Sequence, residues 1–139
     1  MKNVLKSKKG FTLIELVLVI TVLGILAVAA LPNFIDVSTN ASQASRDGVV
    51  GAVRAGVSLF RANDLVQNGP PGIFPATLDA VADGTAASPA APIFGTIMQQ
   101  PITDGSWTKV DAATYTFNDG TTTFTYTYTP AAGTFTAKS

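Results

Sequence analysis

Hydrophobic side chains follow three successive patterns along the chain. The first is a nearly continuous apolar run from residue 11 to residue 31, interrupted by Thr12, Glu15, Thr21 and Gly24. An α-helix rises about 1.5 Å per residue, so a helix of this length spans roughly 30 Å, the thickness of the hydrocarbon core of a bilayer. Residues 11–31 are therefore predicted to form a membrane helix.

The second pattern has a helical period and extends from residue 32 to about residue 64. Apolar residues recur there at spacings of three and four, which places one apolar stripe along a helix. The stripe consists of Val50, Val53, Val57 and Phe60. Pro32 lacks a backbone N–H and weakens a helix, so two possibilities stay open: one long bent helix, or a membrane helix that ends at Pro32 before a separate helix begins.

Arginines and glycines interrupt this second pattern. The arginines lie eight and seven residues apart, so they are expected to form a polar face that is exposed to solvent or contacts acidic side chains of neighbouring chains. They are Arg46, Arg54 and Arg61. Each glycine weakens a helix by about 0.5–1 kcal/mol relative to alanine, and its small size suits close packing against another chain. The glycines are Gly48, Gly51 and Gly56.

A connector rich in Pro, Ala and Gly follows, because helix-breaking residues between 67 and 72 end the helical pattern. It extends to about residue 104. Within it, Pro75 precedes a segment that ends at Asp83 and is followed by Gly84. Proline is favoured in the first turn of a helix and glycine just past its end. Residues 75–83 are therefore predicted to form one short helix.

The third pattern is typical of β-structure. Segments rich in Thr and aromatic residues predict strands at residues 107–110, 115–117, 121–128 and 134–137. Asn118-Asp119-Gly120 is a strong hairpin turn between two of them. In the longest strand aromatic residues alternate with threonines, which places the aromatic rings on one face. These rings, expected to pack on the apolar stripe of the helix, belong to Phe124, Tyr126 and Tyr128.

The three patterns together predict the α+β class. A long N-terminal helix, with a membrane half at residues 11–31 and an amphipathic half at residues 32–64, would pack on a small antiparallel sheet. Residues 65–139 would form the globular head, which contains the connecting loop and the sheet.

Charge is distributed unevenly, although the formal net charge is zero. Four of the nine basic residues lie in the first nine positions, so five basic and nine acidic side chains remain beyond residue 10. A nucleic-acid partner is not expected, because binding to phosphates needs a clustered basic patch. The N-terminal lysines should stay on the cytoplasmic side of the membrane, which places the C-terminal part across it. These lysines are Lys2, Lys6, Lys8 and Lys9.

The chain contains neither cysteine nor histidine, which excludes disulfides and thiolate nucleophiles and removes the commonest general base. No catalytic residue, cofactor or enzymatic activity is therefore expected. Asp104-Gly105-Ser106 and Asn118-Asp119-Gly120 offer oxygen atoms of the kind that calcium accepts. Both segments are predicted to be turns, and no metal site is expected.

Glu15 distinguishes the apolar run from an ordinary secretory signal peptide. Ala27-Val28-Ala29 does imitate a signal-peptidase site, but the apolar run is longer than the usual 7–15 residues and holds a carboxylate near its start. A lone carboxylate within a membrane helix usually has a partner and a function.

The stretch Lys9-Gly10-Phe11-Thr12-Leu13-Ile14-Glu15-Leu16, followed by an apolar helix, resembles the prepilin motif of type IV pilins and type II secretion pseudopilins. The resemblance implies a leader at residues 1–10, cleavage by prepilin peptidase between Gly10 and Phe11, and N-methylation of Phe11. Gly24 and Pro32 match positions where the family often has residues that weaken or kink the helix, and they imply flexibility there.

Cleavage would leave an amino group on Phe11, about one helical turn from Glu15. In a neighbouring chain shifted along the helix axis the two groups could pair directly. The best attested use of such a pair in a medium of low dielectric constant is to fix register. Phe11 and Glu15 are therefore the predicted assembly residues.

The resemblance implies a major pilin of a type IV pilus, and residues 31–36 and 48–53 are similar to mannose-sensitive haemagglutinin pilins. Expected partners are other copies of the chain in a helical homopolymer, prepilin peptidase, the inner membrane and the pilus assembly machinery. The precursor would lie in the inner membrane and the assembled filament outside the cell. The alternatives are a type II secretion pseudopilin and a minor pilin that binds a surface ligand.

Overall fold

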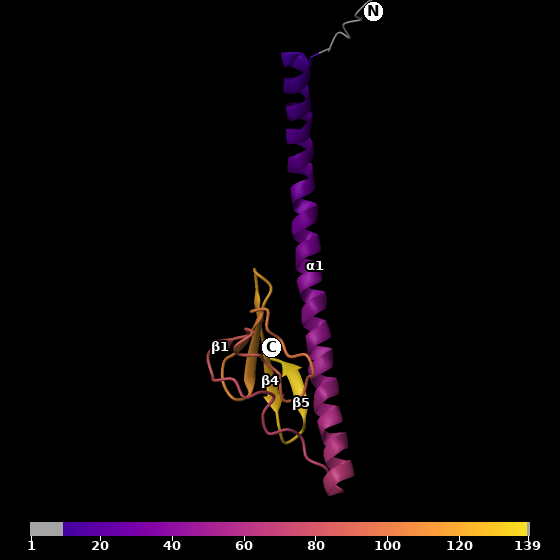
Figure 1. Ribbon diagram of the computed structural model, residues 1–139, viewed down its shortest axis with the longest axis vertical. Helices are drawn as coiled ribbons and strands as arrows, with labels where there is room; N and C mark the ends of the chain where they lie inside the picture. Colours follow the sequence, from indigo (N-terminus) through magenta and orange to yellow (C-terminus); the bar gives the residue numbers. More distant parts are fainter. Residues whose placement is uncertain (1–9, 139) are drawn as a thin grey trace, which may run out of the picture. The chain divides into compact units, whose positions relative to one another are not determined.

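The computed structural model describes residues 10–138, with the side chains of residues 32–36 excepted. Residues 1–9 of the predicted leader lie outside this range. Within the described residues one long helix precedes five strands, so the predicted α+β class is confirmed (Figure 1). The elements are α1 (Leu13–Asn68), β1 (Thr85–Ala86), β2 (Trp107–Lys109), β3 (Thr114–Asn118), β4 (Thr123–Thr129) and β5 (Thr134–Ala137).

The N-terminal part of α1 belongs to the first of two compact units, which comprises residues 1–39. Leu13–Leu31 is long and apolar enough to cross a membrane, and none of it is buried within the protein. The hydroxyl of Thr21 donates a hydrogen bond of 2.7 Å to the carbonyl of Val17 and so satisfies its own polar group within the helix. The helical backbone continues through Pro32 without a break. A separate helix starting after Pro32 is therefore excluded.

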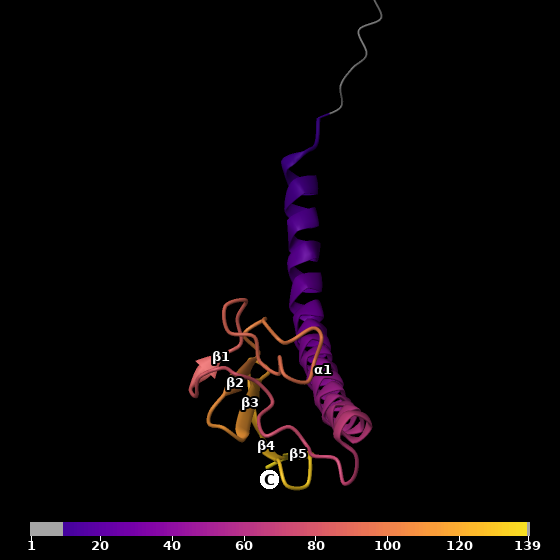
Figure 2. The same cartoon turned by 60° about the horizontal axis from the view of Figure 1, so that its bottom comes forward.

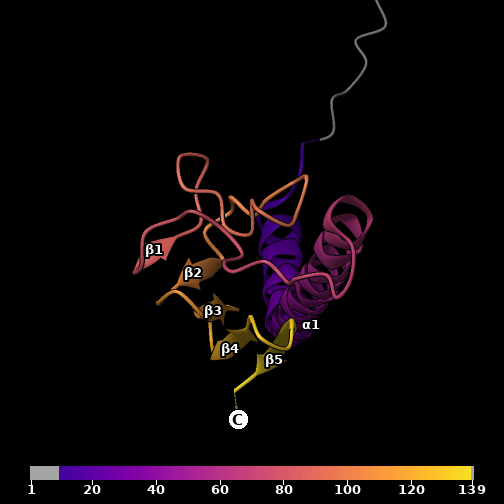
Figure 3. The same ribbon diagram turned by 90° about the horizontal axis from the view of Figure 1, so that it is seen from below.

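The second unit, residues 40–139, contains the rest of α1 and the sheet. Its five strands are all antiparallel and follow one another in chain order (Figure 3). The predicted hairpin turn is confirmed: Asn118 pairs with Thr123, and Gly120 has a φ of +92° that favours glycine. The amides of Thr121 and Thr122 donate to the Asp119 carboxylate within this turn.

The core lies between the apolar stripe of α1 and one face of the sheet. Val50, Val53 and Val57 are buried there, as predicted. They join a cluster of aromatic side chains from the sheet and the connector: Phe94, Trp107, Tyr115, Phe117, Tyr126, Tyr128 and Phe135. Phe60 was expected to complete the stripe, and this was wrong. It is only half-buried, beside Thr96 and Ile97 of the connector.

The short helix predicted at residues 75–83 does not form. This part of the chain is irregular, and the connector between α1 and β2 contains only the short strand β1 as regular structure (Figure 2). Leu78 is fully buried, and the Asp79 carboxylate accepts hydrogen bonds from the amides of Val81 and Phe94. These tertiary contacts of the extended segment replace the hydrogen bonds that a local helix would make.

The three arginines of α1 make contacts with the head of their own chain. The Arg46 guanidinium lies 4.3 Å from the centre of the Phe124 ring, and that of Arg61 lies 4.7 Å from the Phe74 ring. Arg54 Nε donates a hydrogen bond of 2.9 Å to the carbonyl of Phe135 on β5. Arg54 and Arg61 are exposed to solvent, as expected, and Arg46 is partly buried. The structure adds that all three side chains also hold the helix to the head of their own chain.

The glycines of α1 differ in what surrounds them. A Cβ added to Gly56 would lie 2.5 Å from the Ile97 carbonyl oxygen, whereas one added to Gly48 or Gly51 would meet nothing within 4 Å. Gly56 therefore lets the connector backbone approach the helix of its own chain. Only Gly48 and Gly51 remain open to the predicted packing against another chain.

Gly56→Ala is expected to destabilise the head by about 1–2 kcal/mol, because the overpacking cost exceeds the gain in helix propensity. Gly48→Ala is the matched control and should stabilise the head by about 0.5–1 kcal/mol. The measurement is denaturant unfolding of the detergent-solubilised chain, followed by the fluorescence of Trp107, its one tryptophan. Equal effects of the two substitutions would contradict the assignment of Gly56 to the contact with Ile97.

Candidate processing and assembly site

The predicted cleavage position lies just before α1. Phe11 is 91 % exposed, and a side chain added to Gly10 would meet no atom within 4 Å. The fold of the chain itself therefore gives no reason for a glycine at position 10. The bond between Gly10 and Phe11 is accessible in the described structure.

Thr12 and Glu15 cap the start of α1. The carbonyl of Thr12 accepts the first helical hydrogen bond, from the amide of Leu16. The Thr12 hydroxyl accepts a bond of 3.3 Å from the Glu15 amide, and Glu15 Oε2 accepts a bond of 2.8 Å from the Thr12 amide in return. This is a capping box, in which two amides that lack helical partners are satisfied reciprocally.

Sequence reasoning missed this capping box, although Thr-Leu-Ile-Glu fits its pattern of a threonine three residues before a glutamate. The carboxylate was assigned only to a partner in another chain. The Thr12 hydroxyl also donates 2.9 Å to Oε2, so both contacts of the carboxylate converge on one oxygen. Within the described part of the chain the other oxygen, Oε1, accepts no hydrogen bond. Glu15 therefore starts the helix and retains an oxygen for a second partner.

Residues 5–31 match the family model described as the prokaryotic N-terminal methylation motif. The matched segment spans the Gly10–Phe11 bond, the capping box and the apolar half of α1. This chain carries the N-terminal methylation motif of prepilins. The motif on which the predicted resemblance to the type IV pilin family rests is thereby confirmed.

Curated relatives of this pilin-like chain are pilus and fimbrial proteins. It is 47 % identical over 51 residues to the type IV narrow pilus major component PilA5 of Thermus thermophilus, which covers 37 % of the chain and 44 % of that protein. It is 31 % identical over 102 residues to fimbrial protein EcpC of Eikenella corrodens, covering 73 % of the chain and 58 % of that protein.

Fimbrial protein Q of Moraxella bovis is 50 % identical over 52 residues, which cover 37 % of the pilin-like chain and 31 % of that protein. In each case the match spans less than two thirds of the relative. None of the three is named as a mannose-sensitive haemagglutinin pilin, so that narrower likeness stays a prediction. No solved structure matches the chain.

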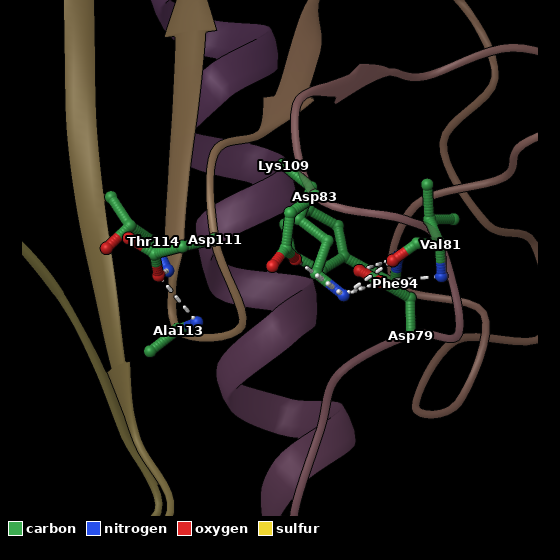
Figure 4. Close-up of polar contacts among 8 residues, drawn as sticks. All are labelled: Asp79, Val81, Asp83, Phe94, Lys109, Asp111, Ala113 and Thr114. Atoms are coloured by element: carbon green, nitrogen blue, oxygen red, sulfur yellow. Dashed lines mark hydrogen bonds and ion pairs between the residues drawn. The ribbon is translucent and has the colours of Figure 1, made fainter.

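The head contains a polar cluster that the sequence did not reveal. Lys109 Nζ lies 3.0 Å from Asp79 Oδ1 and 3.8 Å from an oxygen of Asp83 (Figure 4). The side chains of Lys109 and Asp79 are 6 % and 0 % exposed. A signal was present, because alternation along β2 places Lys109 on the same face as the buried Trp107.

Tyr115 lies beside this cluster. Its hydroxyl is buried and has no partner at hydrogen-bonding geometry among the described residues. Burial and the nearby Asp79 charge raise the pKa of Tyr115 far above its usual value, because a phenolate would be poorly solvated and repelled. The phenol therefore stays neutral at physiological pH.

The exposed aspartates of the head stabilise turns. Asp104 accepts hydrogen bonds from the amide and hydroxyl of Ser106, and Asp111 accepts bonds from the amides of Ala113 and Thr114 (Figure 4). The bond from the Ala113 amide and the contact with Thr114 lower the pKa of Asp111 below its ordinary value, because both favour the carboxylate. The turn prediction for residues 104–106 is confirmed by these contacts.

Proposed function

We propose that the chain is the major structural subunit of a type IV pilus. It is made as a prepilin in the inner membrane, cut after Gly10 by prepilin peptidase and N-methylated on Phe11. The mature subunits then assemble outside the membrane into a homopolymer through their N-terminal helices. The match of residues 5–31 to the methylation motif carries this proposal. The exposed Gly10–Phe11 bond in front of a capped apolar helix supports it.

Assembly would bury the apolar surface that the isolated chain exposes. The side chains of Leu13–Leu31 are almost all exposed in the single chain, and an exposed apolar surface of this kind needs either a membrane or other protein around it. Gly24 and Pro32 would then provide flexibility while the helix moves from the membrane into the filament. The head, which the three arginines of α1 hold to the helix, would remain outside the helical core of the filament.

Within the filament, Glu15 would pair with the Phe11 amino group of an adjacent subunit. Oε2 is already held by Thr12, so Oε1 is the oxygen available to that amine. A charged pair that is buried between chains contributes little net stability but penalises every misaligned arrangement. The pair would therefore set the register between subunits.

Filaments sheared from cells and analysed by N-terminal sequencing and mass spectrometry test this proposal. Abundant fibres built of this chain, with N-methylated Phe11 as the first residue, are the expected result. Recovery of the processed chain from the inner membrane alone would instead assign it to a pseudopilus. Its presence as a trace component of fibres built from another protein would make it a minor pilin.

Gly10→Val is expected to leave the leader attached in nearly all of the chain, because a branched side chain next to the cleaved bond obstructs close approach of the peptidase to the backbone. The control is Gly48→Ala, which changes another exposed glycine far from the bond. Intact mass measures the ratio of precursor to mature chain. Normal processing of Gly10→Val would contradict cleavage at this position.

A further inference from the structure

The polar cluster of the head holds an amine and a carboxylate in contact away from water. Lys109 Nζ donates to Asp79 Oδ1 at 3.0 Å and to the Val81 carbonyl at 2.7 Å. The Asp79 carboxylate is fully buried. Its Oδ1 also accepts from the Val81 amide at 3.1 Å, and its Oδ2 accepts from the Phe94 amide at 3.4 Å. The backbone thus holds in position the amine and the carboxylate, the two groups from which an amide bond could form.

The surroundings of this pair are largely apolar. The ring of Phe94 lies 5.5 Å from Trp107 and 4.8 Å from Tyr115, and all three side chains are fully buried. Removing two charges from water is costly, so a buried ion pair is often no more stable than a neutral arrangement of similar shape. Transfer of one proton from the ammonium to the carboxylate would remove both charges and leave a nucleophilic amine next to a carboxylic acid.

We propose that Lys109 and Asp79 condense to form an intramolecular isopeptide bond between Lys109 Nζ and Asp79 Cγ. Asp79 and Lys109 are thirty residues apart in the chain, so the bond would join the irregular connector to strand β2. It would be a covalent brace in a head that contains no cysteine and therefore no disulfide.

The atoms of this reaction balance without any further reactant. One ammonium proton moves to Asp79 Oδ2, the free amine attacks Cγ, and the C–N bond forms. Asp83, whose carboxylate lies 3.8 Å from Nζ and is 59 % exposed, takes a second proton from the nitrogen and passes it to Oδ2. The Cγ–Oδ2 bond then breaks, and Oδ2 leaves as water with both protons. The third proton stays on the amide nitrogen, and Asp83 is regenerated.

The product would keep two hydrogen bonds with the backbone of Val81 and lose the one from the Phe94 amide. Oδ1 becomes the amide oxygen and still accepts from the Val81 amide, while the remaining N–H donates to the Val81 carbonyl. The longer bond from the Phe94 amide, at 3.4 Å, goes to the oxygen that leaves. Well-oriented groups within one molecule react as if at roughly 10⁵–10⁸ M, and this effective concentration can drive a condensation that does not occur between free side chains in water.

Trypsin digestion of the denatured full-length chain, extracted from the cells that make it, tests the proposal directly. Trypsin cleaves after unmodified lysine and arginine, so an uncondensed chain gives separate peptides 62–109 and 110–138. An acylated Lys109 resists cleavage. The expected product is therefore one peptide, residues 62–138, lighter by one water molecule, with fragment ions that locate the cross-link at Asp79 and Lys109.

Three variants accompany this measurement. Lys109→Arg keeps the charge and the trypsin site but has no amine that can form this amide, so it should give the two separate peptides. Asp83→Asn should reduce the cross-linked fraction by at least about tenfold if Asp83 carries the proton. Asp104→Asn, which changes an exposed aspartate whose carboxylate binds Ser106 and not Lys109, should leave the cross-linked fraction unchanged.

Complete cleavage after Lys109 in the wild-type chain, with both peptides at full mass, would overturn the proposal and leave an ordinary buried ion pair. A cross-link that persists in Asp83→Asn would refute the role of Asp83 as the proton carrier. A cross-link at any residue other than Asp79 would likewise refute the assignment. Because the peptides are read after denaturation, detection of the cross-link does not depend on the folded state of the sample.

Discussion

Filament yield is expected to fall by at least about tenfold when Glu15 is replaced by glutamine, whereas cleavage after Gly10 continues. Glutamine preserves the acceptor oxygen that Thr12 contacts in the capping box. Either glutamate or glutamine can occupy the last position of this motif. The helix should therefore still begin at Leu13. Only the negative charge is lost, and with it the proposed pairing with the Phe11 amine of the adjacent subunit.

Thr12→Val is the matched control for this substitution. It removes the hydroxyl contacts of the capping box, at a cost of about 1 kcal/mol in the stability of the first helical turn, but it leaves the carboxylate charged. Filament yield should fall much less than in Glu15→Gln. Processing is read from intact mass, and filament yield from the amount of chain in the sheared fraction relative to cells.

The reverse order of effects would refute the register hypothesis. Normal filaments from Glu15→Gln together with loss of filaments from Thr12→Val would show that Glu15 acts as a helix cap and not as a charge. Glu15→Ala removes the charge and the cap together, so it cannot separate these two roles. The comparison of Glu15→Gln with Thr12→Val separates the two roles, because the first variant removes the charge and the second disrupts the helix cap.

Phe94→Ala is expected to destabilise the head by about 3–5 kcal/mol, the range for removing a buried phenylalanine ring. Phe94 is fully buried and its ring contacts those of Trp107, Tyr115 and Phe135. Truncation would leave a cavity at the centre of this cluster. The midpoint of denaturant unfolding, followed by Trp107 fluorescence in the full chain, measures the loss.

Phe94→Gly should be less destabilising than Phe94→Ala by about 1 kcal/mol, which reverses the usual order of the two residues. The reason is the backbone of Phe94, whose φ of +65° lies in the left-handed region that glycine adopts without strain. Both variants create the same kind of cavity, so their difference isolates the conformational term. An alanine variant as stable as the glycine variant would show that position 94 carries no such strain.

The strain at Phe94 has a structural cause in the connector. Its amide points to Asp79 Oδ2, and its carbonyl accepts hydrogen bonds from the amides of Ile97 and Met98. These contacts fix the backbone while the ring fills the core between α1 and the sheet. Nothing in the local sequence around Phe94 predicts a left-handed residue there, because its buried ring and its bond to Asp79 depend on residues far away in the chain.

Local chemistry was sufficient to predict much of this protein. The apolar run from residue 11 to residue 31 has the length of a membrane helix. The valine stripe repeats at the period of a helix, and the alternation of aromatic residues with threonine repeats at the period of a strand. Such signals depend only on residues close together in the chain, so they can be recognised without knowledge of the fold. The Asn118-Asp119-Gly120 turn and the methylation motif are equally local and were equally visible.

Only the tertiary structure decided the features that depend on residues far apart in the chain. Residues 75–83 do not form the predicted helix, because Leu78 and Asp79 are buried in tertiary contacts. The arginines of α1 contact aromatic rings and a carbonyl of the head. Lys109 pairs with the carboxylate of Asp79, which lies thirty residues earlier in the chain. Sequence periodicity cannot report such contacts, because the partner and the distance to it exist only once the chain has folded.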